Sequence, residues 1–173
     1  SSDATNTGYY LRKGLEEKNA VNGNNMLSGA DFQMFRYAEV LLSYAEAQNE
    51  AIGPDASVYA ALNLIKVRAE LPALVVGSMT QAEMREELAQ ERRVELYFEM
   101  KRYLDLIRTK TAEIYLNGVS KGMRIDLVNG KWVFTVINAP AGSMLFVAPK
   151  NYLWPIPQSA IDRNKNLTQN PGY

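Results

Sequence analysis

The sequence predicts a mostly α-helical fold with a small β-hairpin and a loop-rich C-terminal tail. Over 31–69 and 80–109, apolar residues recur every three or four positions, the spacing that places them on one face of an α-helix. Asn129-Gly130 lies between two stretches rich in β-branched residues, a strong signal for a two-residue β-hairpin over 123–137. Four of the seven prolines lie in 149–173, which favours an extended, docked segment over a helix. The length of 173 residues is typical of one domain.

The N-terminal part of the chain predicts loops followed by a helical hairpin. Residues 1–30 are rich in Asn and Gly, with one short ordered piece expected at Tyr9-Tyr10-Leu11. Residues 31–69 then predict two antiparallel helices, because Gly53-Pro54 interrupts their shared apolar period. This pair is similar in spacing to a tetratricopeptide repeat unit, and no second copy of the repeat is visible in the chain.

A third, long helix is expected over 80–109. It begins with a capping box at Thr80-Gln81-Ala82-Glu83, and its apolar stripe continues through Leu96 to Ile107. Charged side chains of both signs accompany this stripe at three- and four-residue steps, which predicts a structural ion-pair network. The network consists of Arg92, Glu95, Glu99, Arg102, Asp105 and Arg108.

Composition excludes several classes of function. Nineteen Lys and Arg balance nineteen Asp and Glu, so the chain lacks the positive field on which nucleic-acid binding depends. There is no Cys and no His, which removes disulfides, thiol nucleophiles, imidazole bases and Cys/His metal sites. No nucleotide-binding motif, metal-ligand cluster or apolar stretch of membrane-spanning length is present, and we expect no cofactor and no metal. The first eight residues do not have the pattern of a signal peptide.

One pair of carboxylates has a spacing that general acid–base catalysis uses. Glu91 and Glu95 lie four residues apart on one helix face, as in a possible glycoside hydrolase site. Glycosidase carboxylates usually face each other from separate elements, and several arginines lie within two turns of this pair. An ion-pair network is therefore the favoured interpretation, and we expect a protein that is not an enzyme.

Three aromatic residues are candidate ligand contacts, because a sugar ring packs its apolar face on an aromatic ring. Trp132 lies in the predicted hairpin, where one face can be exposed. Tyr9 and Tyr10 lie in the loop-rich N-terminal segment. Trp154, between Leu153 and Pro155-Ile156-Pro157, is instead expected to pack.

Four segments together resemble the C-terminal half of the SusD/RagB family. They occur in the family's order, they cover nearly all of the chain, and the C-terminal one is very specific. They are 37–47 (YAEVLLSYAEA), 61–72 (ALNLIKVR followed by LP), 91–108 (ERRVEL through RYLDLIR) and 153–173 (LWPIP, then NLTQNPGY). Met100 departs from the pattern, since the family usually has Gly there, and we expect this to limit the close approach of a neighbouring element.

The resemblance implies a fold and a function. Members of this family look like lipid-anchored, glycan-binding proteins on the cell surface of Bacteroidetes. They contain tetratricopeptide-like helix pairs and are not catalytic. They cap a SusC-like TonB-dependent transporter of the outer membrane and help to load oligosaccharide into it for nutrient uptake. The family's N-terminal half, signal peptide and lipidated cysteine have no counterpart here, so we expect a fragment. The glycan-contacting residues vary between members and are not implied by the resemblance.

Two alternatives remain open at this stage. In the first, this half is a scaffold that contacts the transporter, and the missing N-terminal half of the same protein holds the sugar. In the second and more distant one, the chain is a glycoside hydrolase that uses Glu91 and Glu95. We also expect the apolar faces of 31–69 to promote self-association when neighbouring helix pairs are lacking.

Overall fold

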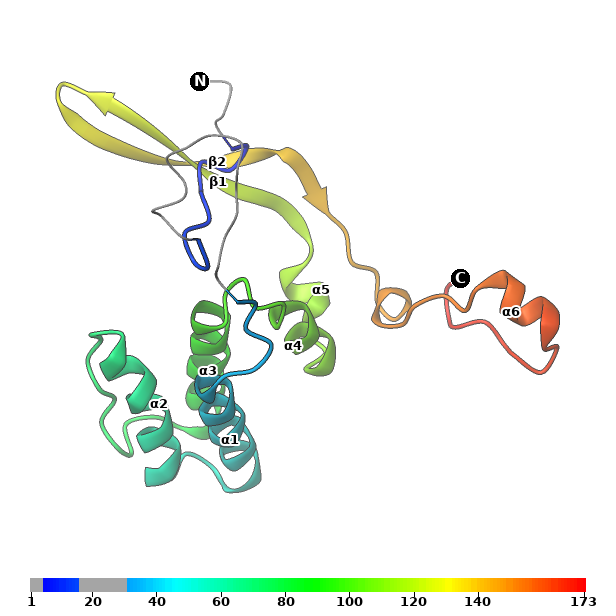
Figure 1. Cartoon of the computed structure of the whole chain (residues 1–173), viewed down its shortest axis with the longest axis horizontal. Coiled ribbons are helices and arrows are strands. Elements are labelled where there is room, and N and C mark those ends of the chain that lie inside the picture. The colour runs from blue at the N-terminus through cyan, green and yellow to red at the C-terminus, as the bar shows by residue number, and fades with distance from the viewer. Residues whose placement is uncertain (1–4, 16–30) are drawn as a thin grey trace. The chain divides into compact units, whose positions relative to one another are not determined.

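The computed structural model describes residues 5–15 and 31–173 (Figure 1). They fall into two compact units, each of which is described by itself. The helical unit comprises residues 31–102, and the hairpin unit comprises residues 5–15 and 103–173. No helix of the described residues is long and apolar enough to cross a lipid bilayer. The mostly α-helical fold class with a small antiparallel sheet is confirmed.

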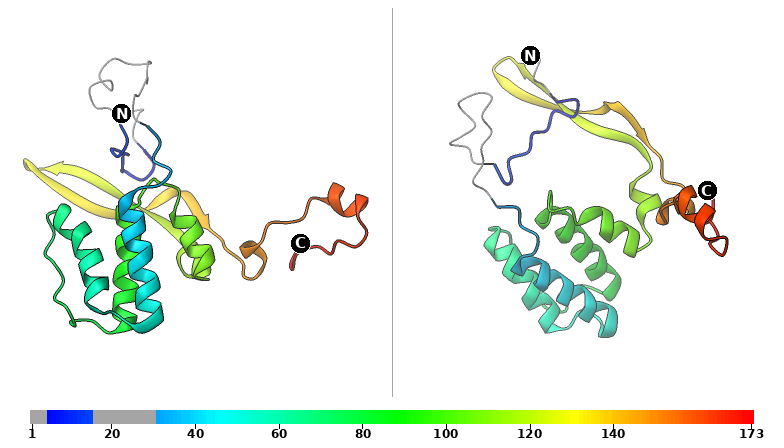
Figure 2. Two further views of the ribbon diagram at one scale, coloured as in Figure 1. Left: turned by 60° about the horizontal axis from the view of Figure 1, so that its bottom comes forward. Right: turned by 45° about the vertical axis from the view of Figure 1, so that its right-hand side comes forward.

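Three helices form the helical unit: α1 (Tyr37–Ile52), α2 (Ala56–Arg68) and α3 (Gln81–Glu95). Figures 1 and 2 show them side by side, with both α2 and α3 in contact with α1. Gly53 ends α1 with a φ of 98°, and Asp55 caps α2 by accepting hydrogen bonds from the N–H groups of Ser57 and Val58. The helix pair expected over 31–69 therefore forms, although its first helix begins at Tyr37.

The core of the helical unit lies between these helices and is almost entirely aliphatic. Tyr59 is its one large polar-tipped side chain, and its hydroxyl accepts a hydrogen bond of 2.9 Å from the Met79 N–H. The same hydroxyl donates to the Met79 carbonyl at 3.5 Å, so the α2–α3 connection pairs both its acceptor and its donor while the ring is fully buried. The other buried apolar residues are Ala38, Leu42, Ala45, Val58, Ala61, Leu62, Ile65, Met84, Leu88 and Leu96.

The prediction of a single helix over 80–109 is wrong. α3 ends at Glu95, and a separate helix, α4 (Arg102–Arg108), follows after a six-residue turn. Within the turn, Phe98 and Met100 have φ angles of 63° and 60°, in the left-handed region that a right-handed helix cannot contain. The helical spacing of apolar residues continues through the turn, so this spacing does not predict the break between the two helices.

Met100 was expected to matter for packing, and the structure gives a different reason for its position. Its side chain is 77% exposed, so it contacts little. Its φ of 60° is a conformation that glycine adopts freely and that a residue with a Cβ atom adopts only with strain. A glycine here would serve the backbone conformation of the turn rather than the close approach of another element.

The hairpin unit contains α4, α5 (Ala112–Tyr115), β1 (Gly118–Val128), β2 (Lys131–Met144), the 3-10 helix η1 (Lys150–Tyr152) and α6 (Gln158–Arg163). A small core forms around Leu106, Ala112 and Phe146. Tyr152 packs edge-on against Phe146, with the ring centroids 4.8 Å apart. Asn117 secures the same region, because it accepts from the Phe146 N–H and donates to the Phe146 carbonyl.

The β-hairpin is longer than the 123–137 that we expected. β1 and β2 pair antiparallel from Gly118↔Met144 to Val128↔Lys131, with an irregularity between Val119 and Lys121. Asn129 and Gly130 close it with φ angles of 50° and 75°, the two positive values of a type I′ turn. The Asn-Gly signal therefore located the turn correctly.

The C-terminal tail folds back on itself instead of running extended throughout. α6 lies within it, and the two ends of the tail meet through Gln169, which bonds both the N–H and the carbonyl of Ile156. Asn170 donates to the carbonyl of Trp154. The expectation that Trp154 packs is wrong among the described residues, because its side chain is 80% exposed and only its backbone is held.

Candidate functional site

One face of the β-hairpin presents exposed aromatic and aliphatic side chains. Successive side chains of a strand alternate between faces, and directly paired residues share a face. The register therefore gathers six apolar residues on one side, which we name the aromatic face: Met123, Ile125, Leu127, Trp132, Phe134 and Val136. Trp132 is 64% exposed and Phe134 is 63% exposed, so both rings are accessible to a ligand.

The opposite face of the hairpin is more polar. Arg124 donates to Asp126 at 2.9 Å, and Lys131 and Thr135 lie on the same side by alternation. The two faces therefore differ in chemistry, and a ligand with an apolar surface fits the aromatic face.

The backbone of the aromatic residues is also accessible, as the pairing pattern requires. The Met123 N–H donates to the Thr7 carbonyl at 2.8 Å, so the backbone groups of Met123 point away from β2. In an antiparallel ladder this outward orientation repeats at every second residue and is shared by both members of a pair. The backbone groups of Trp132, Phe134 and Val136 consequently lie along the outer edge of β2.

The N-terminal segment lies against the other edge of the hairpin. Thr7 and Gly8 approach the backbone of Gly122 and Met123 so closely that a Cβ atom at Gly8 or Gly122 would overlap it. Tyr9 and Tyr10 follow directly, with 58% and 69% of their surface exposed. Met123 is four residues from Leu127, the partner of Trp132, a separation of about 13 Å along the strand. Tyr9 and Tyr10 therefore follow a segment that contacts the same hairpin as Trp132, but the three residues do not form one compact subsite.

Sequence reasoning named Trp132 and missed Phe134. The two rings are two residues apart in β2 and so share a face. The signal was present, because an aromatic residue at i and i+2 of an expected strand predicts this arrangement.

The charged residues expected to form a network lie on α3, in the turn that follows it and on α4. Glu95 and Glu99 are both bound by Arg36, a residue that the sequence analysis did not consider, and Glu95 is also bound by Arg68. Arg92 donates to Ser43 at 3.2 Å and lies 3.8 Å from Glu46. Beyond the turn, Arg108 pairs with Asp105 of its own helix at 2.9 Å, and Arg102 is the first residue of that helix.

Glu91 and Glu95 are each held by cations. Lys66 lies 3.2 Å from Glu91 and also pairs with Glu87. Burial acts to raise the pKa of Glu95, but hydrogen bonds from Arg68 and Arg36 and their positive charges outweigh it, so the pKa of Glu95 lies below its ordinary value. A general acid needs a raised pKa, and the Glu95 carboxylate has the opposite shift.

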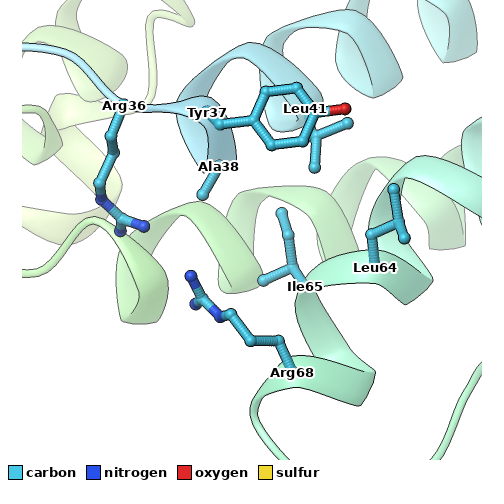
Figure 3. Close-up of a pocket in the computed structure, with 7 residues that line it drawn as sticks. All are labelled: Arg36, Tyr37, Ala38, Leu41, Leu64, Ile65 and Arg68. Carbon is cyan, nitrogen blue, oxygen red and sulfur yellow. The ribbon is translucent and has the colours of Figure 1, made fainter.

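A pocket of about 410 Å³ opens between α1 and α2 (Figure 3). Its apolar wall consists of Tyr37, Ala38, Leu41, Leu64 and Ile65. Arg36 and Arg68 form its polar end, where Figure 3 shows their guanidinium groups directed toward each other; both bind Glu95. The two arginines of the pocket are thus already engaged with an acidic side chain. Within residues 5–15 and 31–173, no cluster of three acidic side chains could hold a metal ion.

The chain is similar to known proteins in both sequence and structure. The model of the SusD family matches residues 1–173. A SusD-like protein of Formosa agariphila is 31% identical over 95% of this chain, which covers 29% of that protein. A solved SusD-like protein from Bacteroides fragilis matches with a TM-score of 0.80 and 30% sequence identity. The match covers 98% of this chain and 31% of that protein. A second solved protein from that organism, described as SusD-like and carbohydrate-binding, matches with a TM-score of 0.72 and 30% sequence identity. The match covers 94% of this chain and 33% of that protein.

Proposed function

Because the chain belongs to the SusD family, we propose that it is part of a cell-surface glycan-binding protein that works with a SusC-like TonB-dependent transporter in nutrient uptake. The chain spans about a third of the length of the relatives that it matches, so the activity and the partners of the whole protein are part of this proposal. We also propose that the whole protein lies at the outer-membrane surface, where a lipid anchor holds it.

The observation that carries the proposal is the pair of exposed rings on the aromatic face. Trp132 and Phe134 present flat apolar surfaces on a regular strand, where a sugar ring can stack. Covering about 100 Å² of apolar surface on one ring contributes about 2.5 kcal/mol at about 25 cal/mol per Å². Two such contacts correspond to binding in the micromolar to millimolar range. Attachment beside a transporter would make such weak binding useful by raising the local concentration of glycan.

We further propose that this binding is not accompanied by catalysis. Glu91 is paired with Lys66, and Glu95 is paired with Arg36 and Arg68. The lowered pKa of Glu95 makes its carboxyl group a poor proton donor at neutral pH. These contacts favour binding over the glycoside hydrolase alternative.

A second candidate is a scaffold role, in which this part supports the N-terminal part of the same protein and contacts the transporter. The exposed apolar residues beside the α1–α2 pocket favour it, because Tyr37 and Leu64 are 69% and 58% exposed. Such surfaces are typical of places where another element packs. Under this alternative the glycan is bound elsewhere.

The two candidates are separated by a matched pair of tryptophan variants. The chain has two Trp residues, and both are exposed. If the aromatic face binds glycan, Trp132→Ala weakens binding to an oligosaccharide found on a glycan array by about seventyfold, since the contribution of one ring, about 2.5 kcal/mol, is lost. Trp154→Ala leaves it unchanged. Equal binding by both variants and the wild type would favour the scaffold role.

A further inference from the structure

The two edges of the β-hairpin differ in what lies against them. On the outer edge of β1, Thr7 accepts a hydrogen bond from Met123. On the outer edge of β2, no strand of the described part of the chain pairs with Trp132, Phe134 or Val136, since the sheet described has two strands. Their outward N–H and C=O groups form a row that another strand can bind.

This edge of β2 lacks the features that usually prevent strand pairing. Between Trp132 and Ile137 there is no charged residue, no proline and no glycine, and the ladder irregularity lies elsewhere, near Val119. The residues there are β-branched or aromatic, the types that fit a sheet best. The edge is therefore built for pairing rather than protected from it.

We propose that β2 pairs antiparallel with β2 of a second copy of this chain, about a two-fold axis at Phe134. In that register Phe134 faces Phe134 of the second copy, and Trp132 faces Val136. All three outward residues then form hydrogen-bonded pairs, each exchanging two N–H···O bonds. The result is a four-stranded antiparallel sheet in which each β2 becomes a central strand.

Side-chain chemistry supports a second copy as the occupant. The register sets aromatic against aromatic and aromatic against β-branched side chains, the pairs that stabilise antiparallel sheets. Lys131, the only charged residue of β2 itself, faces Ile137 of the second copy and lies about 20 Å along the strand from the other Lys131. No like charges oppose each other, so the edge is complementary to itself.

Pairing would also extend the aromatic face. The outward residues Trp132, Phe134 and Val136 all lie on this face, and pairing preserves it. Two copies therefore place four aromatic rings on one continuous surface. A longer glycan chain could contact this surface, a consequence that rests on the proposed function, whereas the pairing itself does not.

The test compares two lysine variants at directly paired positions, Ile125 and Phe134. Both lie on the aromatic face, and only Phe134 lies at the β2 edge. In analytical ultracentrifugation from micromolar to near-millimolar concentration, we expect the wild-type chain to form a dimer that dissociates on dilution. We expect Phe134→Lys to weaken dimerisation by about tenfold or more, because two lysines then face each other. Ile125→Lys is expected to change it by less than about threefold.

Other results would overturn the proposal. If the wild-type chain stays monomeric over the whole concentration range, β2 does not pair with a second copy. Equal weakening by both variants indicates stacking of the aromatic faces, and an unchanged dimer in both indicates another surface, such as the α1–α2 pocket. Hydrogen exchange gives an independent readout: the amides of Phe134 and Val136 should gain protection with concentration. The Thr135 amide, which points into the β1–β2 ladder, should be protected at every concentration and reports that each variant is folded.

Discussion

Arg36, the residue before α1, donates from its Nε to both carboxylate oxygens of Glu99 at 2.9 Å, although 63 residues separate the two in the chain. Its Nη2 also donates to the backbone carbonyl of Glu95, the last residue of α3. One side chain therefore fixes the start of α1 to the turn that ends α3. Hydrogen bonding to Glu99 raises the pKa of Arg36, burial opposes this, and Glu95 adds to the rise.

Replacing Arg36 should destabilise the helical unit strongly. In Arg36→Ala, Glu99 keeps a carboxylate that is only 6% exposed and has lost its contact with the Arg36 guanidinium. Removing one partner of such a buried pair costs about 3 kcal/mol of the free energy of unfolding. Urea unfolding followed by circular dichroism at the helical band measures the change.

The exposed pair of Arg85 and Glu50 is the matched control. Both side chains are close to half exposed, so Arg85→Ala should change the unfolding midpoint far less. Arg36→Lys should not restore wild-type stability, because an ammonium group cannot reproduce the planar fork of the guanidinium. Equal losses in Arg36→Ala and Arg85→Ala would contradict the role given to Arg36.

Glycine at position 100 should stabilise the chain. Met100 holds a φ of 60° with a side chain that is 77% exposed, so Met100→Gly relieves strain and removes few contacts. We expect the free energy of unfolding to rise by about 1 kcal/mol. Val94→Gly, at an exposed position in the last turn of α3, should instead lower it by about 0.5 kcal/mol, since glycine is a poorer helix former than valine. A loss of stability in both variants would show that the turn does not require a left-handed residue.

Acid should destabilise the helical unit over a defined pH range. The hydrogen bond from Ser57, with further ones from Gln48 and the cap backbone, lowers the pKa of Asp55 from 3.8 to about 2. The pKa of Glu95 also lies below its ordinary value of 4.5. Groups with lowered folded pKa values stabilise fully above their unfolded values and lose this contribution as pH falls through the folded ones. Stability should therefore be level above about pH 5 and decline between 4.5 and about 2.

Urea midpoints at a series of pH values check this expectation. Asp55→Asn keeps a capping side chain without the titrating carboxyl, so its midpoint should fall less steeply below pH 3.8 than that of the wild type. A midpoint that is constant from pH 5 to pH 2 in the wild type would rule out both lowered pKa values.

Two leucines of α2 test where the core lies. Leu62 is fully buried between the three helices, and Leu64, two residues further along, is 58% exposed beside the pocket. Leu62→Ala should lower the free energy of unfolding by about 3 kcal/mol, because it leaves a cavity. Leu64→Ala should lower it by less than about 1 kcal/mol. The reverse order would place the core on the other side of α2.

Much of the fold could be predicted from local patterns. The capping box at Thr80 and Glu83, the stop at Gly53 and the Asn129-Gly130 turn each depend on residues close in sequence, and each is present. The break at Phe98 and Met100 could not be found this way, because the apolar period continues through it. The contact of Arg36 with Glu99 likewise spans 63 residues, beyond the reach of any local pattern.

The candidate site was predictable in part. Trp132 was named because a strand in a hairpin leaves one face open, and the register then added Phe134 to the same face. The failure at Trp154 has a physical reason. A segment rich in proline and aromatic residues has the composition of a packed one. Here, however, Tyr173 and Asn170 bind the backbone carbonyls of Leu153 and Trp154, and the Trp154 side chain itself is exposed.

Tryptophan fluorescence tests the central claim most directly, because the chain has only Trp132 and Trp154. In Trp154→Phe, Trp132 is the sole indole, and a glycan that stacks on it must change its environment. We predict a saturable shift and intensity change on titration with the bound oligosaccharide, and none in Trp132→Phe, where Trp154 alone reports. A saturable change in Trp132→Phe with none in Trp154→Phe would contradict glycan binding at the aromatic face.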